Sequence, residues 1–281
     1  MRLESGWGRF TAADTTALVY SARPAAAEEP LPAVVLVQEI WGVDEFITDV
    51  AGRFAAAGYL AYAPDLYSPG GARPPALAAA RIARAKEFLD TLPHASWWDA
   101  ETREAALAGL PLEEGEALAA TFAALLGPHA DDGHLDILHA AVAAVRADDT
   151  CDGRVGVAGW CRGGALAGRL ACVEPGLDAA VIFYGAAPPA EDVPGVGCPV
   201  LGLYGGADPV VTDGVPAFAA AMEAAGKHFA WRVYDGAPHA FFNDTRAAYH
   251  VAAARDAWAE TLTFFSRHLA VSPPARCGET G

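Results

Sequence analysis

The segment Gly159–Gly163 constrains the fold more than any other part of the chain. An apolar, β-type run over Arg154–Ala158 leads into it, and a helical pattern over Gly164–Cys172 follows directly. A strand that passes into a helix so abruptly needs a sharp turn, which flanking glycines tolerate because positive φ costs glycine little. The pattern is that of a nucleophile elbow, G-x-S-x-G, with the thiol of Cys161 in place of the serine hydroxyl. It places one sulfur at the start of a helix, where the helix dipole favours the thiolate.

Apolar β-type runs and helical patterns alternate along the rest of the chain. Several of the β-type runs are continuous apolar stretches bounded by Gly, Pro or Asp, as expected for strands buried on both faces. The predicted strands are Ala17–Ser21, Ala33–Gln38, Tyr59–Ala63, Arg154–Ala158, Ala179–Tyr184, Pro199–Tyr204 and Phe229–Tyr234. The predicted helices are Glu45–Ala57, Leu135–Ala147, Gly164–Cys172, Gly214–Ala225 and Ala247–Leu269. The alternation predicts the α/β class, a three-layer α/β/α sandwich with a mainly parallel sheet and with site loops at the C-terminal ends of its strands.

The segment 68–133 interrupts this alternation. It opens with a stretch rich in proline and glycine and continues with helical patterns over Ala76–Leu89 and Gly115–Leu126. No repeat or low-complexity run marks a second domain, so we expect residues 1–270 to form one domain and residues 271–281 a disordered tail. The segment is either a peripheral insertion or a partial cap over the site. We favour the cap, because long excursions within compact domains are often functional lids.

The charge balance limits the partners of the protein. The chain has 19 Lys and Arg against 35 Asp and Glu, a net charge of −16, so it offers no basic stripe for nucleic acid. No apolar run approaches the roughly 18 residues that span a bilayer, and the N-terminus lacks the apolar core of a secretory signal. We therefore expect a cytoplasmic monomer or small homo-oligomer that binds a small molecule and neither nucleic acid nor membrane.

Of the cysteines, Cys161 is the one that lies in a motif with a chemical role. The five cysteines are scattered and include no C-x-x-C pair, which fits neither a disulfide framework nor a metal site. Cys172 and Cys198 have apolar neighbours in the sequence and are expected to be small buried side chains. Cys161 is the candidate nucleophile.

Two further loops supply the partners that a thiol nucleophile needs, a base and a carboxylate that orients the base. Asp208 follows the predicted strand Pro199–Tyr204, and His239 follows the predicted strand Phe229–Tyr234. With Cys161 they occur in the order nucleophile, acid, histidine that belongs to the elbow motif. Each has an ordinary alternative. Asp208 could be a helix N-cap, His239 a loop histidine and Cys161 a buried thiol. The three placements together predict a catalytic triad.

A fourth candidate is Glu39, which follows the predicted strand Ala33–Gln38 and precedes a tight turn. Buried near the thiol, its carboxylate could accept the S–H hydrogen bond or raise the pKa of the thiol. The alternative is an exposed loop acid. The backbone N–H groups of Ile40, in the same turn, and of Arg162, just after the nucleophile, are predicted to form the oxyanion hole.

Five short motifs together resemble the dienelactone hydrolases, or carboxymethylenebutenolidases. They are Gln38-Glu39-Ile40-Trp41-Gly42, Ala63-Pro64-Asp65-Leu66-Tyr67, Gly159-Trp160-Cys161-Arg162-Gly163-Gly164, Gly205-Gly206-Ala207-Asp208 and Pro238-His239-Ala240-Phe241. The resemblance runs from about Gly6 to Leu269 and implies an α/β-hydrolase fold in which Cys161 attacks a lactone carbonyl. It also implies that Glu39 holds the resting thiol and moves on substrate binding to take its proton, while Asp208 orients His239.

Two departures from the family pattern bear on the substrate. The family binds the substrate's carboxylate with two arginines, one of them just past the catalytic histidine, where this chain has Asn243. The other comes from the region after Asp65-Leu66-Tyr67, where the candidates are Arg73, Arg81, Arg84 and Arg103. The hydrolase chemistry is therefore expected to carry over better than the specificity for lactones.

These observations predict a hydrolase that cleaves a lactone or small carboxylic ester through a Cys-His-Asp triad and a thioester, without a metal or other cofactor. The alternative within the same fold is an esterase or thioesterase that acts on a non-acidic acyl substrate. A non-catalytic ligand-binding protein would be expected to have lost the triad, and no resolving cysteine suggests a redox role. The candidate substrate-binding residues are Trp41, Trp98, Tyr184, Phe241 and Asn243, although aromatic residues at such places more often pack in the core.

Overall fold

The strands of the described residues form one eight-stranded sheet. The computed structural model describes residues 1–92, 99–127 and 133–269. The strands are β1 (Leu3–Ala12), β2 (Thr15–Pro24), β3 (Leu31–Val37), β4 (Leu60–Pro64), β5 (Cys151–Trp160), β6 (Ala179–Phe183), β7 (Val200–Gly205) and β8 (Phe229–Tyr234). Their order is β1-β2-β4-β3-β5-β6-β7-β8; the pairs β1–β2 and β2–β4 are antiparallel and the others parallel. The predicted, mainly parallel sheet is confirmed.

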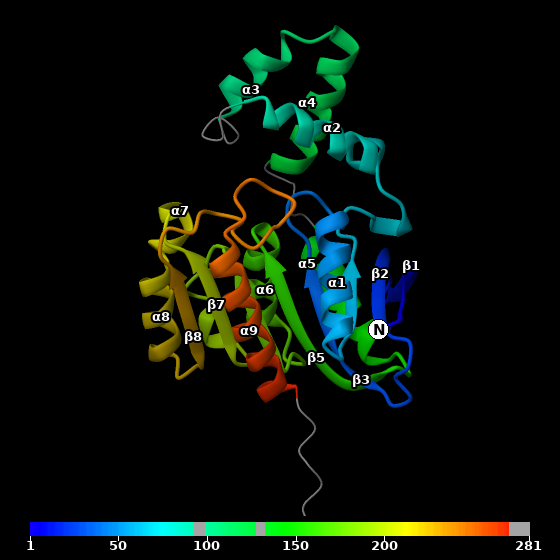
Figure 1. Cartoon of the computed structure of the whole chain (residues 1–281), viewed down its shortest axis with the longest axis vertical. Helices are drawn as coiled ribbons and strands as arrows, with labels where there is room; N and C mark the ends of the chain where they lie inside the picture. The colour runs from blue at the N-terminus through cyan, green and yellow to red at the C-terminus, as the bar shows by residue number, and fades with distance from the viewer. Residues whose placement is uncertain (93–98, 128–132, 270–281) are drawn as a thin grey trace, which may run out of the picture.

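Helices cover both faces of the sheet, as Figure 1 shows. They are α1 (Glu45–Ala56), α5 (His134–Arg146), α6 (Arg162–Val173), α8 (Val215–Ala224) and α9 (Val251–His268). Alternate side chains of β3 divide the core, since Val35 and Val37 pack with α5, α6 and α8, whereas Val34 and Leu36 pack with α1 and α9. All four side chains are fully buried, so the continuous apolar run of β3 requires a helical layer on each side. This confirms the three-layer α/β/α fold.

The N-terminal hairpin extends the sheet beyond the predicted strands. β2 contains the predicted strand Ala17–Ser21, but β1 has no counterpart among the sequence patterns. Of the ten residues of β1 only Phe10 is buried, so the strand lacks the apolar run that marks the others. Its position follows from its pairing with β2 along the whole length of both strands, which no local pattern reveals.

Three helices stand apart from these layers, above the C-terminal ends of the strands in Figure 1. They are α2 (Ala79–Asp90), α3 (Ala100–Leu107) and α4 (Leu112–Leu126), and we refer to them as the insertion. The patterns predicted α2 and α4 but not the short, largely exposed α3. Short 3-10 helices, η1 (Pro69–Gly71) and η2 (Pro75–Leu77), lead into the insertion, and η4 (Val193–Gly195) precedes β7.

An apolar cluster joins the insertion to the end of the sheet. Ile40 and Trp41, after β3, pack with Phe88 of α2 and Phe122 of α4, and the partly buried Cys161 packs against the same cluster. The insertion therefore meets the sheet at the predicted nucleophile. The organisation of residues 1–270 as one domain stays a prediction.

Within the described part of the chain, no helix combines the length and the apolarity needed to cross a bilayer. Two expectations fall outside the described residues. They are the substrate-binding candidate Trp98 and the disordered tail 271–281.

Candidate active site

Cys161 lies at the turn between β5 and α6, with φ of 56° and ψ of −120°. Residues other than glycine rarely adopt this conformation, and those that do are often found at functional sites. The flanking glycines have no positive φ. A Cβ on Gly159 would lie 2.0 Å from the carbonyl oxygen of Gly163, and a Cβ on Gly163 would lie 2.2 Å from that of Val37. The explanation of these glycines by positive φ is therefore wrong: the positive φ falls on the cysteine, and the glycines allow the close approach of strand and helix.

The three predicted triad residues meet at the C-terminal edge of the sheet. His239, in the loop after β8, has its Nε2 3.2 Å from Cys161 Sγ and its Nδ1 2.6 Å from Asp208 Oδ2. Asp208 occupies the N-cap position of the short helix α7 (Pro209–Thr212), yet its side chain makes no capping bond. The carboxylate is directed to the histidine, so the N-cap alternative does not describe its side chain.

The surroundings of His239 favour its protonated form. Burial alone would lower the pKa of the imidazole, but hydrogen bonds to Asp208 and Cys161, together with the negative charges of both, raise the pKa of His239 to about 10. An imidazolium beside a sulfur stabilises the thiolate and can give a proton to a leaving group. The arrangement can therefore hold a thiolate–imidazolium pair that a carboxylate orients.

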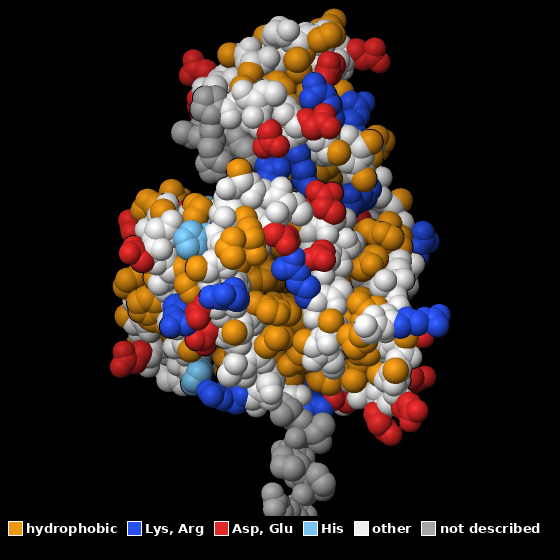
Figure 2. All heavy atoms as spheres, viewed as in Figure 1, with side chains coloured by type: hydrophobic (Ala, Val, Ile, Leu, Met, Phe, Trp, Pro, Cys, Tyr) orange, Lys and Arg blue, Asp and Glu red, His pale blue; other side chains and the backbone are white. Residues whose placement is uncertain are grey.

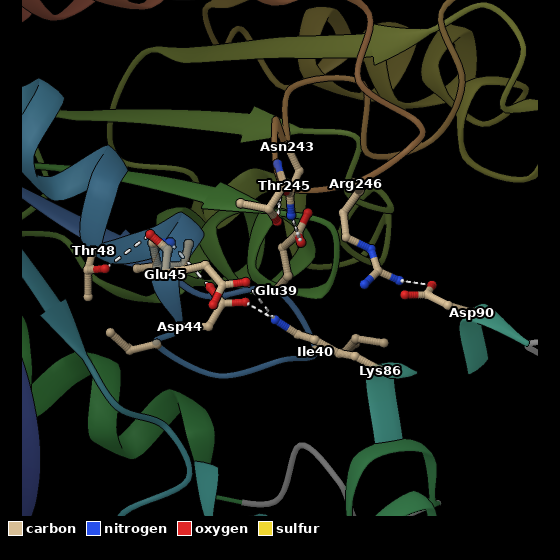
Figure 3. Close-up of polar contacts among 12 residues, drawn as sticks. Glu39, Ile40, Asp44, Glu45, Thr48, Lys86, Asp90, Asn243, Thr245 and Arg246 are labelled. Carbon is tan, nitrogen blue, oxygen red and sulfur yellow. Dashed lines mark hydrogen bonds and ion pairs between the residues drawn. The ribbon is translucent and has the colours of Figure 1, made fainter. Parts of the chain in front are cut away.

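Glu39 is 5% exposed, so it is not the exposed loop acid that the sequence left possible. Its Oε2 accepts a hydrogen bond from Asn243 Nδ2 at 2.7 Å, as Figure 3 shows, and its Oε1 accepts one from the Tyr184 hydroxyl at 3.2 Å. Burial raises the pKa of Glu39 to about 6, although the hydrogen bond from Asn243 lowers it. The resemblance implied a glutamate that holds the thiol; in this structure the hydrogen-bond partner of Sγ among the described residues is His239.

The two backbone N–H groups predicted to form the oxyanion hole lie at the start of α6, on Arg162, and in the turn after β3, on Ile40. Arg162 is the first residue of α6, so its N–H has no acceptor within the helix. In the turn after β3, the carbonyl of Glu39 accepts from the N–H of Gly42 at 3.3 Å. The carbonyl and the N–H of one trans peptide point in opposite directions. The N–H of Ile40, which shares the peptide with that carbonyl, is therefore directed away from the turn.

Three of the substrate-binding candidates are fully buried. Tyr184 and Phe241 pack with 5.4 Å between their ring centroids, and Asn243 binds Glu39 through its amide. Their side chains have no exposed surface to offer a ligand in this structure. Tyr184 and Asn243 instead contact the carboxyl group of Glu39, and Phe241 belongs to the core that α9 covers.

Two cations lie over the ring of Trp41 at the junction of the insertion and the sheet. Lys86 Nζ and Arg246 Cζ lie 5.7 and 5.5 Å from the centroid of its ring. Lys86 of α2 binds Asp44 at 2.6 Å, and Arg246 binds Asp90 of α2 at 3.1 Å, so both ion pairs cross the junction (Figure 3). Acidic and basic side chains gather along this junction in Figure 2. Arg246 was not predicted from the sequence, because no local pattern distinguishes it from other arginines.

The arginines considered for a substrate carboxylate mostly have partners within the protein. Arg73 and Arg84 each bind a carboxylate at 2.6 Å, and Arg103 lies over an aromatic ring. Arg81 is exposed on α2. Acids of the protein therefore already neutralise two of the four candidates.

Comparisons with known proteins find similar sequences along most of the chain. The model of the dienelactone hydrolase family matches residues 18–269. A protein of Saccharolobus solfataricus, provisionally named a carboxymethylenebutenolidase, is 32% identical over 245 residues, which cover 86% of this chain and 92% of that protein. A protein of Escherichia coli with the same provisional name is 30% identical over 267 residues, which cover 89% of this chain and 82% of the relative.

Solved structures show the same fold. One from Klebsiella pneumoniae, provisionally named a dienelactone hydrolase, is 28% identical, with a TM-score of 0.66 and coverage of 95% of this chain and 100% of that one. A thermostable esterase from Pseudomonas putida is 15% identical, with a TM-score of 0.64 and coverage of 96% and 84%. The second likeness bears on the fold alone, which is that of the α/β-hydrolases.

Proposed function

The chain belongs to the dienelactone hydrolase family and is a hydrolase of lactones or esters, and we propose that it acts through a triad of Cys161, His239 and Asp208 and through a thioester intermediate. The observation that carries the proposal is the double contact of His239, 3.2 Å from Nε2 to Sγ and 2.6 Å from Nδ1 to Asp208 Oδ2. An imidazole held in this way can take the thiol proton and return it to a leaving group.

In the first half-reaction the thiolate of Cys161 attacks the carbonyl carbon of the substrate. The tetrahedral oxyanion that forms accepts hydrogen bonds from the N–H groups of Ile40 and Arg162. As the carbon–oxygen bond of the ester breaks, the imidazolium of His239 gives its proton to the departing oxygen, and a thioester remains on the sulfur. When the substrate is a lactone, the alcohol stays attached to the acyl group.

In the second half-reaction water adds to the thioester carbonyl while neutral His239 takes one of the water's protons. The carbon–sulfur bond then breaks, the carboxylic acid leaves, and the thiolate–imidazolium pair is restored. The sum is one ester and one water converted to one acid and one alcohol. The scheme needs no metal and no cofactor.

Glu39 is the fourth group in the proposed site. In this structure its two oxygens accept from Tyr184 and Asn243, and the sulfur of Cys161 contacts His239, so Glu39 must move before it can take a proton from the thiol. We assign it the role of an auxiliary proton acceptor that a bound substrate displaces toward Cys161. His239 is the base that already contacts the sulfur.

The acyl group that the site accepts is the second question. The apolar cluster that joins the insertion to the sheet packs against Cys161, which supports the interpretation of the insertion as a partial cap. Asn243 is neutral, and Arg73 and Arg84 are paired with acids. These observations favour the second candidate function, an esterase or thioesterase that acts on a non-acidic acyl substrate.

Two measurements test the proposal. Cys161→Ala should lower the hydrolysis of dienelactone and of p-nitrophenyl esters by more than about 10³-fold, whereas Cys172→Ala, which removes a buried thiol of α6, should leave both rates nearly unchanged. Iodoacetamide should modify Cys161 in preference to the buried Cys151, Cys172 and Cys198 in the folded protein, with the modified residue located by peptide mass spectrometry. Full activity of Cys161→Ala would refute the triad, and a clear preference for neutral esters over dienelactone would favour the second candidate.

A further inference from the structure

The motif Asp65-Leu66-Tyr67 has no part in the triad, yet it contacts the turn that carries the proposed oxyanion donor. The hydroxyl of Tyr67 donates to the carbonyl oxygen of Ile40 at 2.8 Å. Tyr67 is 2% exposed, so water does not compete freely for this bond. One side chain from the loop after β4 thus reaches the backbone of the residue whose N–H is the candidate donor.

Together with a bond inside the turn, the bond from Tyr67 restrains two successive peptide groups. The carbonyl of Glu39 accepts from the N–H of Gly42, and the carbonyl of Ile40 accepts from Tyr67. Because each peptide group is planar, fixing both carbonyls limits φ and ψ of Ile40 and with them the direction of its N–H. Without the hydroxyl, the 3.3 Å bond to Gly42 would be the one that remains of these two restraints.

The ion pair of Asp65 and Arg73 links Tyr67 to Val43, at the far end of the turn. Asp65 is fully buried, accepts from the N–H of Tyr67 at 3.2 Å and binds Arg73 Nε at 2.6 Å. Arg73 Nη2 in turn donates to the carbonyl of Val43 at 3.4 Å. The segment after β4 therefore contacts the turn at Ile40 and again at Val43.

Gly42 shows how closely this unit is packed. Its φ is +81°, and a Cβ there would lie 2.9 Å from Arg73 Nη2 and 3.2 Å from Tyr67 Cδ2. A side chain at this position would displace the two residues that hold the turn. Glycine is therefore required here both by its backbone conformation and by the contact.

We propose that Tyr67 is a positioning residue of the oxyanion hole, whose hydroxyl aligns the Ile40 N–H by holding the Ile40 carbonyl. The inference rests on the proposed function, because it takes the Ile40 N–H as an oxyanion donor. Tyr67 itself touches no reacting atom. It acts on the transition state through the backbone of Ile40, with Asp65 and Arg73 as the support that places its ring.

Two reactions of the same sulfur separate this role from a merely structural one. Acylation by a p-nitrophenyl ester passes through an oxyanion, whereas alkylation by iodoacetamide does not. Loss of one oxyanion donor lowers turnover about 10²–10³-fold, and a misaligned donor should forfeit part of that. Tyr67→Phe should therefore acylate roughly 10–100-fold more slowly, with KM and the alkylation rate little changed.

The matched control is Tyr204→Phe, which removes another buried hydroxyl, one without a hydrogen-bond partner among the described residues. It should change neither rate. If Tyr67→Phe is folded and acylates as fast as the wild type, or if both of its rates fall equally, the inference is overturned. Neither result bears on the triad, which the variant Cys161→Ala tests separately.

Arg73→Lys provides a second variant should Tyr67→Phe not fold. Lysine keeps the positive charge beside Asp65 but cannot reach both Asp65 and Val43 as the guanidinium does. A selective loss of acylation relative to alkylation would support the inference, and an unchanged ratio would overturn it. Arg84→Lys, which alters an ion pair within the insertion, is its control.

Discussion

Asn243 donates its side-chain amide to Glu39 at 2.7 Å, from a position 204 residues further along the chain. The other end of the amide sets its orientation, because Asn243 Oδ1 accepts from the N–H and the hydroxyl of Thr245 at 3.0 and 2.7 Å. Burial raises the pKa of Glu39 to about 6, and the bond from Asn243 opposes that rise only in part. The charge of this buried carboxyl group therefore changes not far below neutral pH.

The stability of the protein should report this titration. Since the pKa of Glu39 is about 6 in the folded state against 4.5 for an ordinary glutamate, the native state binds more protons than the unfolded state between these values. The contribution of Glu39 to the free energy of unfolding should thus fall as the pH rises from 4.5 to 6, by up to about 2 kcal/mol. Glu39→Gln should abolish this fall.

Urea unfolding across this pH range measures the difference between the wild type and Glu39→Gln. The exposed Glu28 supplies the control variant Glu28→Gln, which should follow the wild type. A difference between wild type and Glu39→Gln that does not vary with pH would contradict the raised pKa.

Asn243→Asp should place a second carboxyl group at hydrogen-bond distance from Glu39. Two buried carboxylates so close cannot both ionise, so the pair retains one proton to higher pH. We expect a loss of roughly 2 kcal/mol or more near pH 8 and a much smaller loss near pH 5. Thr245→Val removes one bond to Asn243 without adding charge and should cost about 1 kcal/mol or less at both pH values. Equal losses for Asn243→Asp at the two pH values would argue against charge repulsion.

The ion pair of Lys86 and Asp44 should hold the insertion to the sheet. Each side chain is 13% exposed and the two atoms lie 2.6 Å apart, so the pair is better shielded than a surface salt bridge. Lys86→Met keeps the apolar stem but leaves Asp44 without this cation. Amide hydrogen exchange in α2 should become about 10-fold faster, which corresponds to about 1.4 kcal/mol.

Hydrogen exchange followed by mass spectrometry measures this effect. Arg232→Met removes an exposed ion pair beside α9 and should leave the exchange of α2 unchanged. If the amides of α2 exchange as slowly in Lys86→Met as in the wild type, the ion pair does not restrain the insertion.

Gly163→Ala should be among the most damaging single substitutions in the core. The new Cβ would lie 2.2 Å from the carbonyl oxygen of Val37, and this contact joins two backbones that cannot separate without moving β3 from α6. We expect a loss of about 3 kcal/mol or more, measured as a lower midpoint of denaturation or as a lack of soluble protein. Gly6→Ala, where no atom lies within 4 Å of the new Cβ, should fold normally, and similar stability of the two variants would refute the steric argument.

The parts of the site that the sequence predicted are those that depend on the ends of strands. Cys161, Asp208 and His239 each follow a parallel strand, β5, β7 and β8 respectively, that ends at the same edge of the sheet, so their convergence follows from the topology. The structure brings them to hydrogen-bond distance. The same logic placed Glu39 after β3 but said nothing of the groups it would contact.

The parts that the sequence did not predict depend on contacts between distant segments. The bond from Tyr67 to Ile40 and that from Asn243 to Glu39 join loops whose sequences carry no periodic pattern. The positive φ of Cys161 was assigned to its flanking glycines because the motif shows where a turn is sharp but not which residue bears the strain. β1 was not predicted, because an exposed edge strand has no apolar run.

The apolar cluster over Cys161 is built mainly from α2 and α4, whereas the triad is built from loops of the sheet. Substitutions of Phe88 or Phe122 would therefore change the apolar cluster that packs against Cys161, whereas His239 and Asp208 lie outside this cluster. On the proposed function, changes within the insertion would alter the packing around the acyl group while the reacting groups at the sheet edge stay in place.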